Sequence, residues 1–284
     1  MSRGRKERRR PGVLRRLATH RSGAVGLATL ICFALVAALG PFVIPFDATR
    51  QDLRESLLAP SALHPLGTDQ LGRDVLARLA FGARYSLTLG VAAVIVGLLV
   101  GVPIGAVSGY LGGWFDLLVQ RVTDAFLAFP GILLALVLVA SLGVGLENVV
   151  IAVGISSMPG FVRLVRASSL RARELLYVEA ARSVGAPGGL IVRRHVLPNA
   201  VPVIAVYASN QVGAAILVAA GLGFLGLGIQ PPTPEWGTML AEARNSIFSY
   251  PNLATFPGLA IALSVLAFNL LGDALRDVLD PRLR

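Results

Sequence analysis

"YVEAARSVGAPGGLIVRRHVLPN", residues 177–199, is a basic stretch between two long hydrophobic segments. It contains three Arg, one Glu and one His, which make it a poor membrane span. Its first half favours a helix with one narrow apolar face, formed by residues that recur every four positions: Leu176, Ala180 and Val184. Gly185 follows the last of these, at the place where a helix-ending glycine is expected.

The second half of this stretch begins after Pro187, which cannot continue the first helix. We expect a second short helix over about 189–196, ending before Pro198, because the residue before a proline disfavours helical backbone. Glu179 and Arg182 lie three residues apart on the first helix and are expected to pair. The sequence therefore predicts a helix, a sharp turn and a short helix.

Outside this stretch the composition is that of a polytopic membrane protein. The 284 residues are 55% hydrophobic and 15% charged, and the mean hydropathy is +0.70. The single cysteine, Cys32, lies in an apolar run and can form no internal disulfide.

Hydrophobic runs without charges predict six transmembrane helices. A spanning helix needs about 20 apolar residues, and the fourth run reaches this length only if Arg163 and Arg166 extend toward the cytoplasmic surface. The apolar part of the first helix exceeds the signal-peptide core of about 7–15 residues, so it is expected to be an uncleaved anchor. The six helices are expected near 23–44, 86–108, 122–143, 147–166, 200–222 and 254–273.

The distribution of Lys and Arg predicts the orientation. Residues 1–22 contain nine Lys and Arg and one acid, the usual composition of a cytoplasmic anchor, and nucleic-acid binding by this tail is not favoured. With both termini cytoplasmic, the inner segments hold 20 Lys and Arg and the outer segments 6. We therefore expect a basic cytoplasmic tail over 1–22 and a second cytoplasmic tail over 274–284.

The 177–199 stretch resembles the EAA motif of ABC-importer permeases. The matching residues are Glu179, Ala180, Ala181, Gly185, Leu197 and Pro198. His195 stands where the family usually has Ile, which is the one departure. The resemblance implies that this loop couples the permease to its ATPase subunits, whereas the alternative without the motif is an ordinary interfacial loop.

Three further stretches resemble the peptide-importer permeases of the DppC/OppC type. They are His64–Leu87, Glu235–Arg244 and Asn269–Arg284. The resemblance implies a type I permease fold, all-α, with the transmembrane domain over 84–273, preceded by a first transmembrane helix and an extracytoplasmic segment over 23–83.

Within the first of these stretches, an apolar stripe and charged residues on the opposite side predict a short helix lying on the outer face. The stripe consists of Leu71, Val75 and Leu79, opposite Arg73, Asp74 and Arg78. This helix is either a plain interface helix or a surface that helps to receive an external binding protein or to close the outer gate.

The resemblance also implies the function. The chain is expected to be one permease subunit of an importer that moves di- or oligopeptides across the bacterial cytoplasmic membrane by alternating access. Its implied partners are a second homologous permease, two cytoplasmic ATPase subunits and an extracytoplasmic binding protein. An importer of nickel chelates or other small solutes is the alternative, because the sequence does not name the substrate.

The chain lacks residues for chemistry of its own. Its only lysine is Lys6, so it cannot form a phosphate-binding P-loop, and ATP with Mg²⁺ is expected to bind the partner subunits. Its three histidines are far apart in sequence, and neither a metal site, a cofactor nor a catalytic residue is expected. The centres of the predicted spans contain no ionisable residue, which argues against a proton-coupled carrier or an intramembrane enzyme.

Amide side chains are the polar groups left for a pathway. Asn210 and Gln211 lie in the fifth predicted span and Asn269 lies in the sixth. They are expected either to hydrogen-bond between helices or to line the pathway. The run 221–234 is too rich in Gly and Pro for one helix and is expected to form a re-entrant turn at the outer face.

Overall fold

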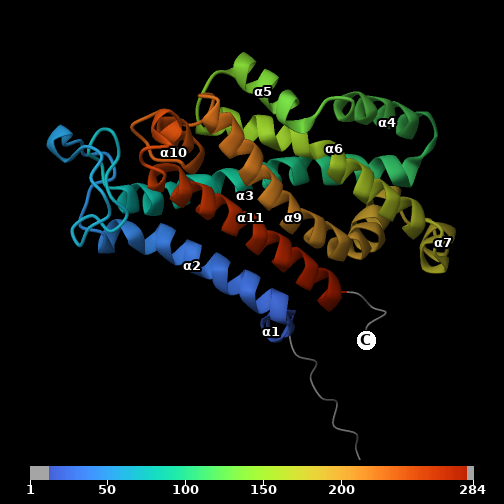
Figure 1. The fold of residues 1–284 in the computed structure, drawn as a ribbon. Helices are drawn as coiled ribbons and strands as arrows, with labels where there is room; N and C mark the ends of the chain where they lie inside the picture. The colour runs from blue at the N-terminus through green and yellow to red at the C-terminus, as the bar shows by residue number, and fades with distance from the viewer. Residues whose placement is uncertain (1–12, 280–284) are drawn as a thin grey trace, which may run out of the picture.

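A computed structural model describes residues 13–279, and their regular structure is helical (Figure 1). Within this range the β pairing is confined to an isolated bridge between Thr68 and Asp74. The predicted all-α fold is confirmed. The helices are α1 (Val13–Thr19), α2 (Arg21–Val43), η1 (Leu53–Glu55), α3 (Val75–Leu111), α4 (Gly113–Leu127), α5 (Gly131–Leu142), α6 (Leu146–Ala172), α7 (Leu176–Ser183), α8 (Gly188–Ile191), η2 (Val192–Val196), α9 (Leu197–Phe224), α10 (Trp236–Ala243), η3 (Arg244–Ser246) and α11 (Asn252–Leu279).

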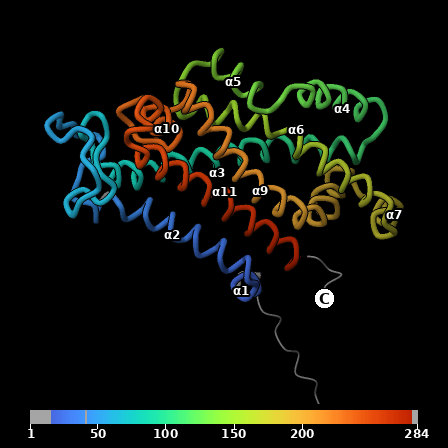
Figure 2. Tube along the Cα trace, viewed as in Figure 1, coloured from blue at the N-terminus to red at the C-terminus, as the bar shows by residue number. Residues whose placement is uncertain are grey.

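The long helices form one bundle. Helix α3 packs most extensively against α6, α9 packs against α11, and α2 packs against α11 and α3. Figures 1 and 2 show the loops of 45–74 and α10 gathered at one end of the bundle and α7 at the other. The 177–199 stretch therefore lies at the opposite end of the bundle from residues 64–74 and from α10.

Among the described residues, α2, α3, α6, α9 and α11 are each long and apolar enough to cross a membrane. The pair α4 and α5 also qualifies if the two helices count as one span, although they are bent by 89°. This arrangement matches the six predicted spans in order, with the third span broken rather than continuous.

The break in the third span lies at 128–130. Pro130 has no backbone N–H to donate, and its ring disfavours helical backbone at Phe129. Pro130 itself adopts φ −55° and ψ 131°, so the helix stops and starts again at Gly131. The expected continuous helix over 122–143 was therefore wrong.

Helix α3 begins eleven residues earlier than the predicted second span, at Val75 instead of residue 86. Asp74 caps it, because its Oδ1 accepts a hydrogen bond from the backbone N–H of Ala77 at 2.7 Å. The expected separate helix on the outer face was wrong, since Val75 and Leu79 belong to the first turns of α3. The charged residues that were predicted to lie opposite the apolar stripe, Arg73, Asp74 and Arg78, are buried.

Glycines on α3 allow its close packing against α6. Four of them recur every four residues and face α6: Gly97, Gly101, Gly105 and Gly109. A Cβ on Gly101 would lie 2.8 Å from the carbonyl oxygen of Met158, and one on Gly109 would lie 2.6 Å from that of Arg166. Such a row of small residues is typical of membrane helices whose backbones touch, so α3 and α6 form a tightly packed pair.

Candidate functional site

We call the 177–199 loop the cassette. Its first arm is α7. Its end is a hydrogen-bonded turn in which Gly185 has φ +79°. The Gly185 N–H donates to the Arg182 carbonyl at 2.9 Å, and the Ala186 N–H donates to the Ala181 carbonyl at 3.0 Å. This pair of bonds is the Schellman motif, so the predicted turn at Gly185 is confirmed.

The second arm is α8, followed by the π-helical turn η2. The chain then continues into α9 without a break, and Pro198 lies in the first turn of α9. A proline is tolerated there because the first N–H groups of a helix have no intrahelical acceptor. The expectation that the short helix ends before Pro198 was therefore wrong: the arm joins the fifth span directly.

Helix α7 presents an apolar surface that nothing in the described chain covers. Leu176 is 82% exposed and Val184 is 84% exposed, while Val178 on the other side is buried. Glu179 and Ala180 are exposed and lie between these two ends. The predicted apolar face therefore exists and points outward, as a surface for a partner would.

The expected pairing of Glu179 with Arg182 is absent from the ion pairs of residues 13–279. The Arg182 guanidinium instead lies over the ring of Tyr110, 4.9 Å from its centre. Within the cassette, Asn199 Nδ2 donates to Tyr177 Oη at 2.8 Å. Glu179 is thereby left pointing outward, with its carboxylate exposed.

Ion pairs hold α4 against the stem helix α6, which leads into the cassette. Arg166 donates from Nε and Nη2 to the two carboxylate oxygens of Asp116, both at 2.6 Å. Arg163 donates to Asp124 at 2.6 Å. These arginines were expected to extend toward the membrane surface, but they pair with acids of α4, which were not considered as partners.

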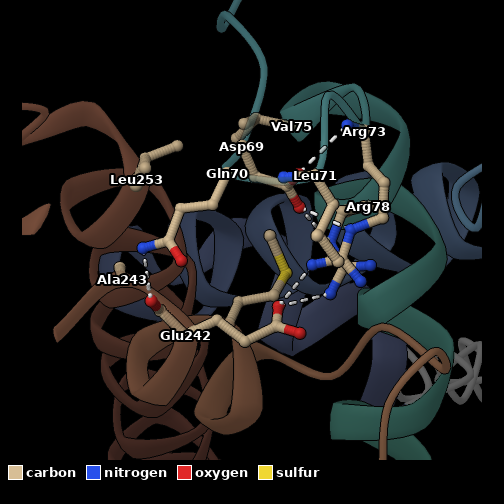
Figure 3. Close-up of a pocket in the computed structure, with 10 residues that line it drawn as sticks. Asp69, Gln70, Leu71, Arg73, Val75, Arg78, Glu242, Ala243 and Leu253 are labelled. Atoms are coloured by element: carbon tan, nitrogen blue, oxygen red, sulfur yellow. Dashed lines mark hydrogen bonds and ion pairs between the residues drawn. The ribbon is translucent and has the colours of Figure 1, made fainter. Parts of the chain in front are cut away.

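At the opposite end of the bundle, a buried charge cluster joins the 45–74 loops and α3 to α10 (Figure 3). Arg78 Nη2 donates to Glu242 Oε2 at 2.7 Å, and Arg73 Nη2 donates to the same oxygen at 3.0 Å. Asp69 Oδ2 accepts from Arg73 Nε at 2.6 Å. The cluster lines a cavity of about 170 Å³ and carries no net charge, since two arginines face two carboxylates.

Further contacts close the same end. Gln70 Nε2 donates to the Glu242 carbonyl at 3.0 Å, and Figure 3 shows the two residues meeting. Asp74, besides capping α3, accepts from His64 Nδ1 at 2.8 Å. Both His64 and Asp74 are buried. Together these contacts make the 45–74 loops a folded cap rather than a loose connection.

A buried carboxylate lies beside this cap. Glu235 is 1% exposed and caps α10. Its Oε1 accepts from Ser86 Oγ at 2.9 Å, and its Oε2 accepts from the Thr238 N–H at 2.9 Å. Burial raises the pKa of the Glu235 carboxyl, although the hydrogen bonds oppose the rise. Helix α9 ends at Phe224, so the run 221–234 does not form one helix, and the segment after α9 leads into a buried, polar joint between α10 and α3.

The three amide residues proposed for a pathway lie in different surroundings. Asn269 is exposed and lines an otherwise apolar cavity of about 630 Å³ between α9 and α11. Asn210 is partly buried against Gly272 of α11, and its Oδ1 has no hydrogen-bond partner among residues 13–279. Gln211 is also partly buried. The structure therefore brings Asn269 to a cavity and places Asn210 between two helices.

No group of three or more His, Cys, Asp or Glu side chains within residues 13–279 is arranged to hold a metal ion.

Sequence reasoning missed the partners of the charged cap, above all Glu242. The signal was indirect: Arg73 and Arg78 follow Asp69 closely and precede a hydrophobic span. It also missed the glycine row of α3, although its spacing of four residues can be read from the sequence. Nothing in the sequence around Tyr110 indicated that it would contact the cassette.

Comparison with known proteins gives consistent matches over nearly the whole chain. Residues 101–284 match the family described as "Binding-protein-dependent transport system inner membrane component". Residues 12–60 match "N-terminal TM domain of oligopeptide transport permease C". Both matches agree with the resemblance that the sequence motifs carry.

Curated relatives and a solved structure point the same way. The chain is 48% identical over 269 residues to the glutathione transport system permease protein GsiD of Pectobacterium atrosepticum, covering 94% of this chain and 89% of that protein. It is 47% identical over 256 residues to the GsiD protein of Escherichia coli, covering 90% of this chain and 84% of that protein. A chain of the MetNI methionine ABC transporter, solved in inward-facing conformations, superimposes with a TM-score of 0.57 at 18% identity, covering 72% of this chain and 97% of that one.

Proposed function

Because this chain belongs to the family of binding-protein-dependent transport system inner membrane components, it is a transporter subunit, and we propose that its substrates are short peptides. The N-terminal match to an oligopeptide permease and the similarity to glutathione permeases support this substrate class. Glutathione is itself a small peptide, so both lines of similarity indicate the same kind of solute. An importer of nickel chelates remains the alternative that an uptake assay would identify.

The exposed apolar surface of the cassette is the observation that carries the proposed coupling role. Leu176 and Val184 are more than four-fifths exposed, and an exposed apolar surface with polar residues beside it is typical of a protein–protein interaction site. Between them lie Glu179 and Ala180, with Ala181 partly covered. The two small alanines allow a partner to approach the α7 backbone closely, and Glu179 offers that partner a charge. We assign this surface to a cytoplasmic ATPase subunit.

The turn and the second arm complete the assignment. Gly185 sets the direction of the second arm, while Leu197 and Pro198 begin α9. A force on α7 would therefore reach two membrane helices, α6 from one side and α9 from the other. This connectivity supports a mechanism in which ATPase closure rearranges the spans and opens the pathway alternately to each side.

Two ATPase subunits, a second homologous permease and an extracytoplasmic binding protein complete the proposed machine. ATP and Mg²⁺ would bind the ATPase subunits, because this chain has a single lysine, Lys6, and no P-loop. The folded cap over 45–74, joined to α10, offers a defined surface for the binding protein. The transmembrane domain would extend over 84–273, with 23–83 forming the first span and most of the cap.

We place the chain in the bacterial cytoplasmic membrane with both termini inside. The excess of Lys and Arg in the segments on the cassette side supports this orientation. The cavity between α9 and α11 would then form part of the pathway, lined by Asn269. Asn210 and Gln211 lie on α9, one of these two helices, and would join Asn269 in lining the pathway when α9 and α11 move apart.

Reconstitution tests the proposal. The complex of this chain with its co-purified partners, in proteoliposomes, should accumulate glutathione or a dipeptide only when ATP and the binding protein are supplied. Glu179→Lys should abolish uptake, because it reverses the charge at the ATPase surface, while the complex remains in the membrane. Active accumulation by this polypeptide alone, without ATPase subunits, would overturn the proposal.

A further inference from the structure

Tyr110 touches both arms of the cassette from outside it. It lies in the last turn of α3 and is partly buried. The Arg182 guanidinium of α7 stacks on its ring, 4.9 Å from the centre. On the other arm, Gly188 begins α8, and a Cβ built on it would lie 3.0 Å from Tyr110 Cε1. One aromatic ring therefore packs against residues on either side of the Gly185 turn.

The turn between the arms has open space around it. A Cβ on Gly185 would meet no atom within 4 Å, and the same is true of Gly189. Few residues of α7 approach α8 directly. The angle between the arms is thus held by the backbone bonds of the turn, by the Tyr177–Asn199 hydrogen bond and by the ring of Tyr110. Among these, Asn199 belongs to α9, and the Tyr110 ring is the contact that α3 supplies.

Helix α3 leads from this contact to the other end of the molecule. It runs from Val75 to Leu111 without an interruption in its helical structure. At its first turns it carries Arg78, which is buried and bound to Glu242 of α10. Its glycine row packs it against α6, the stem of the cassette. Tyr110 therefore lies at one end of a helix whose other end is fixed to the outer cap.

We propose that Tyr110 is a positioning residue that fixes the cassette arms relative to α3, so that displacement of the cassette moves α3 and, through it, the cap. This role deepens the proposed function and rests on it, because it requires that an ATPase subunit displaces the cassette. A tyrosine that only covered apolar surface would contribute to folding, but its loss would leave the amount of substrate moved per ATP unchanged.

Two variants of Tyr110 in the reconstituted complex separate these roles. Tyr110→Phe removes only the long hydrogen bond from Arg182 Nε to Tyr110 Oη, at 3.4 Å, and retains the ring that lies against Arg182 and Gly188, so the glutathione transported per ATP hydrolysed should stay within about twofold of the wild-type ratio. Tyr110→Ala removes the ring, and the ratio should fall about fivefold or more, the equivalent of about 1 kcal/mol of lost positioning. The amount of ATPase subunit bound should be the same in both, since Tyr110 belongs to α3 and is not one of the residues assigned to the docking surface on α7.

A matched pair of glycine variants tests the contact from the cassette side. Gly188→Val pushes a side chain into the Tyr110 ring, whereas Gly189→Val meets open space one residue later in the same helix. The first should lower the transport-to-hydrolysis ratio and the second should not. If Tyr110→Ala keeps the wild-type ratio while Glu179→Lys uncouples the complex, this inference is wrong and the proposed function stands. If the wild-type complex shows no ATP-dependent uptake, the proposed function itself fails.

Discussion

Arg78 and Glu242 join the first turns of α3 to α10: Arg78 Nη2 donates to Glu242 Oε2 at 2.7 Å. The same oxygen accepts from Arg73 Nη2 at 3.0 Å. Both arginine side chains are 2% exposed, while Glu242 is 28% exposed. Glu242 and Asp69 are therefore the two carboxylates that compensate the buried charges of Arg73 and Arg78. Glu242 also connects the N-terminal cap to the C-terminal half of the chain.

Replacing Glu242 by alanine should destabilise the permease strongly. Removing one partner of a buried ion pair costs about 3–5 kcal/mol, because the remaining charge stays buried without compensation. Glu242 is partly exposed, and we expect about 3 kcal/mol, the lower end of this range. Thermal unfolding of the purified chain in detergent measures the loss. Glu174→Ala, which removes an exposed carboxylate without an ion-pair partner in residues 13–279, should leave the midpoint unchanged, and equal shifts for both variants would contradict the assignment.

Glu235 should make the stability of the cap end of the bundle depend on pH. Burial raises the pKa of its carboxyl in the folded protein above the ordinary value of 4.5. Between these two pKa values the folded state binds more protons than the unfolded state, so the free energy of unfolding falls as pH rises through this window. Above the folded-state pKa the full cost of burying the charged carboxylate remains.

Glu235→Gln removes this titration and measures its effect. The amide can accept from the Thr238 N–H and donate to Ser86 Oγ, so the joint between α10 and α3 is retained. The unfolding midpoint of the variant should vary less with pH above pH 4.5, and at neutral pH it should exceed that of the wild type. Parallel curves for the two proteins would show that Glu235 does not titrate in this window.

Labelling of single cysteines tests the orientation. In a Cys32→Ala background, cysteines at Ala62 and Ser249, both exposed at the cap end, should react with an impermeant maleimide in intact cells. A cysteine at Ser183, exposed on the cassette, should react only after the membrane is opened. Labelling of Ser183→Cys from outside would reverse the proposed topology.

The sequence predicted what depends on local chemistry. Apolar length marked the spans, and the Gly185–Pro187 pattern marked the end of α7, because both signals are contained in neighbouring residues. The same local reasoning failed at Pro198, since a proline can begin a helix as well as end one. The proline at Phe129–Pro130 indicated a break in the third span, but a prediction from hydrophobicity alone does not register it.

The extent of α3 and the structure of the cap could not be predicted locally. Arg78 was predicted to lie opposite the apolar stripe of a short outer helix, but it is buried, and Glu242, 164 residues later, supplies a carboxylate to it. Nothing near Arg78 in the sequence identifies that partner. Likewise, the contacts of Asp116 with Arg166 depend on how α4 folds back onto α6, which the spacing of charges does not determine.

Gly185→Val should uncouple the permease without unfolding its spans. Gly185 has φ +79°, a conformation that costs a side-chain-bearing residue about 1–2 kcal/mol and a β-branched residue more. No atom lies within 4 Å of the added Cβ, so the effect comes from the backbone and not from a clash. The valine should relax the turn and misdirect α7, and the ATPase subunits should bind weakly or hydrolyse ATP without transport. Uptake of glutathione per unit of permease in the membrane measures this loss.

Gly189→Val is the control for this prediction, because its Cβ also meets no atom within 4 Å while its backbone is not in the left-handed region. Both variants add the same side chain to the same loop, Gly185→Val at the turn and Gly189→Val four residues later in α8, so a difference between them isolates the turn. We expect Gly189→Val to retain most of the wild-type uptake and Gly185→Val to lose it at equal membrane abundance. If both variants transport at the wild-type rate, the angle of the cassette does not matter for coupling, and the loop serves only to connect α6 with α9.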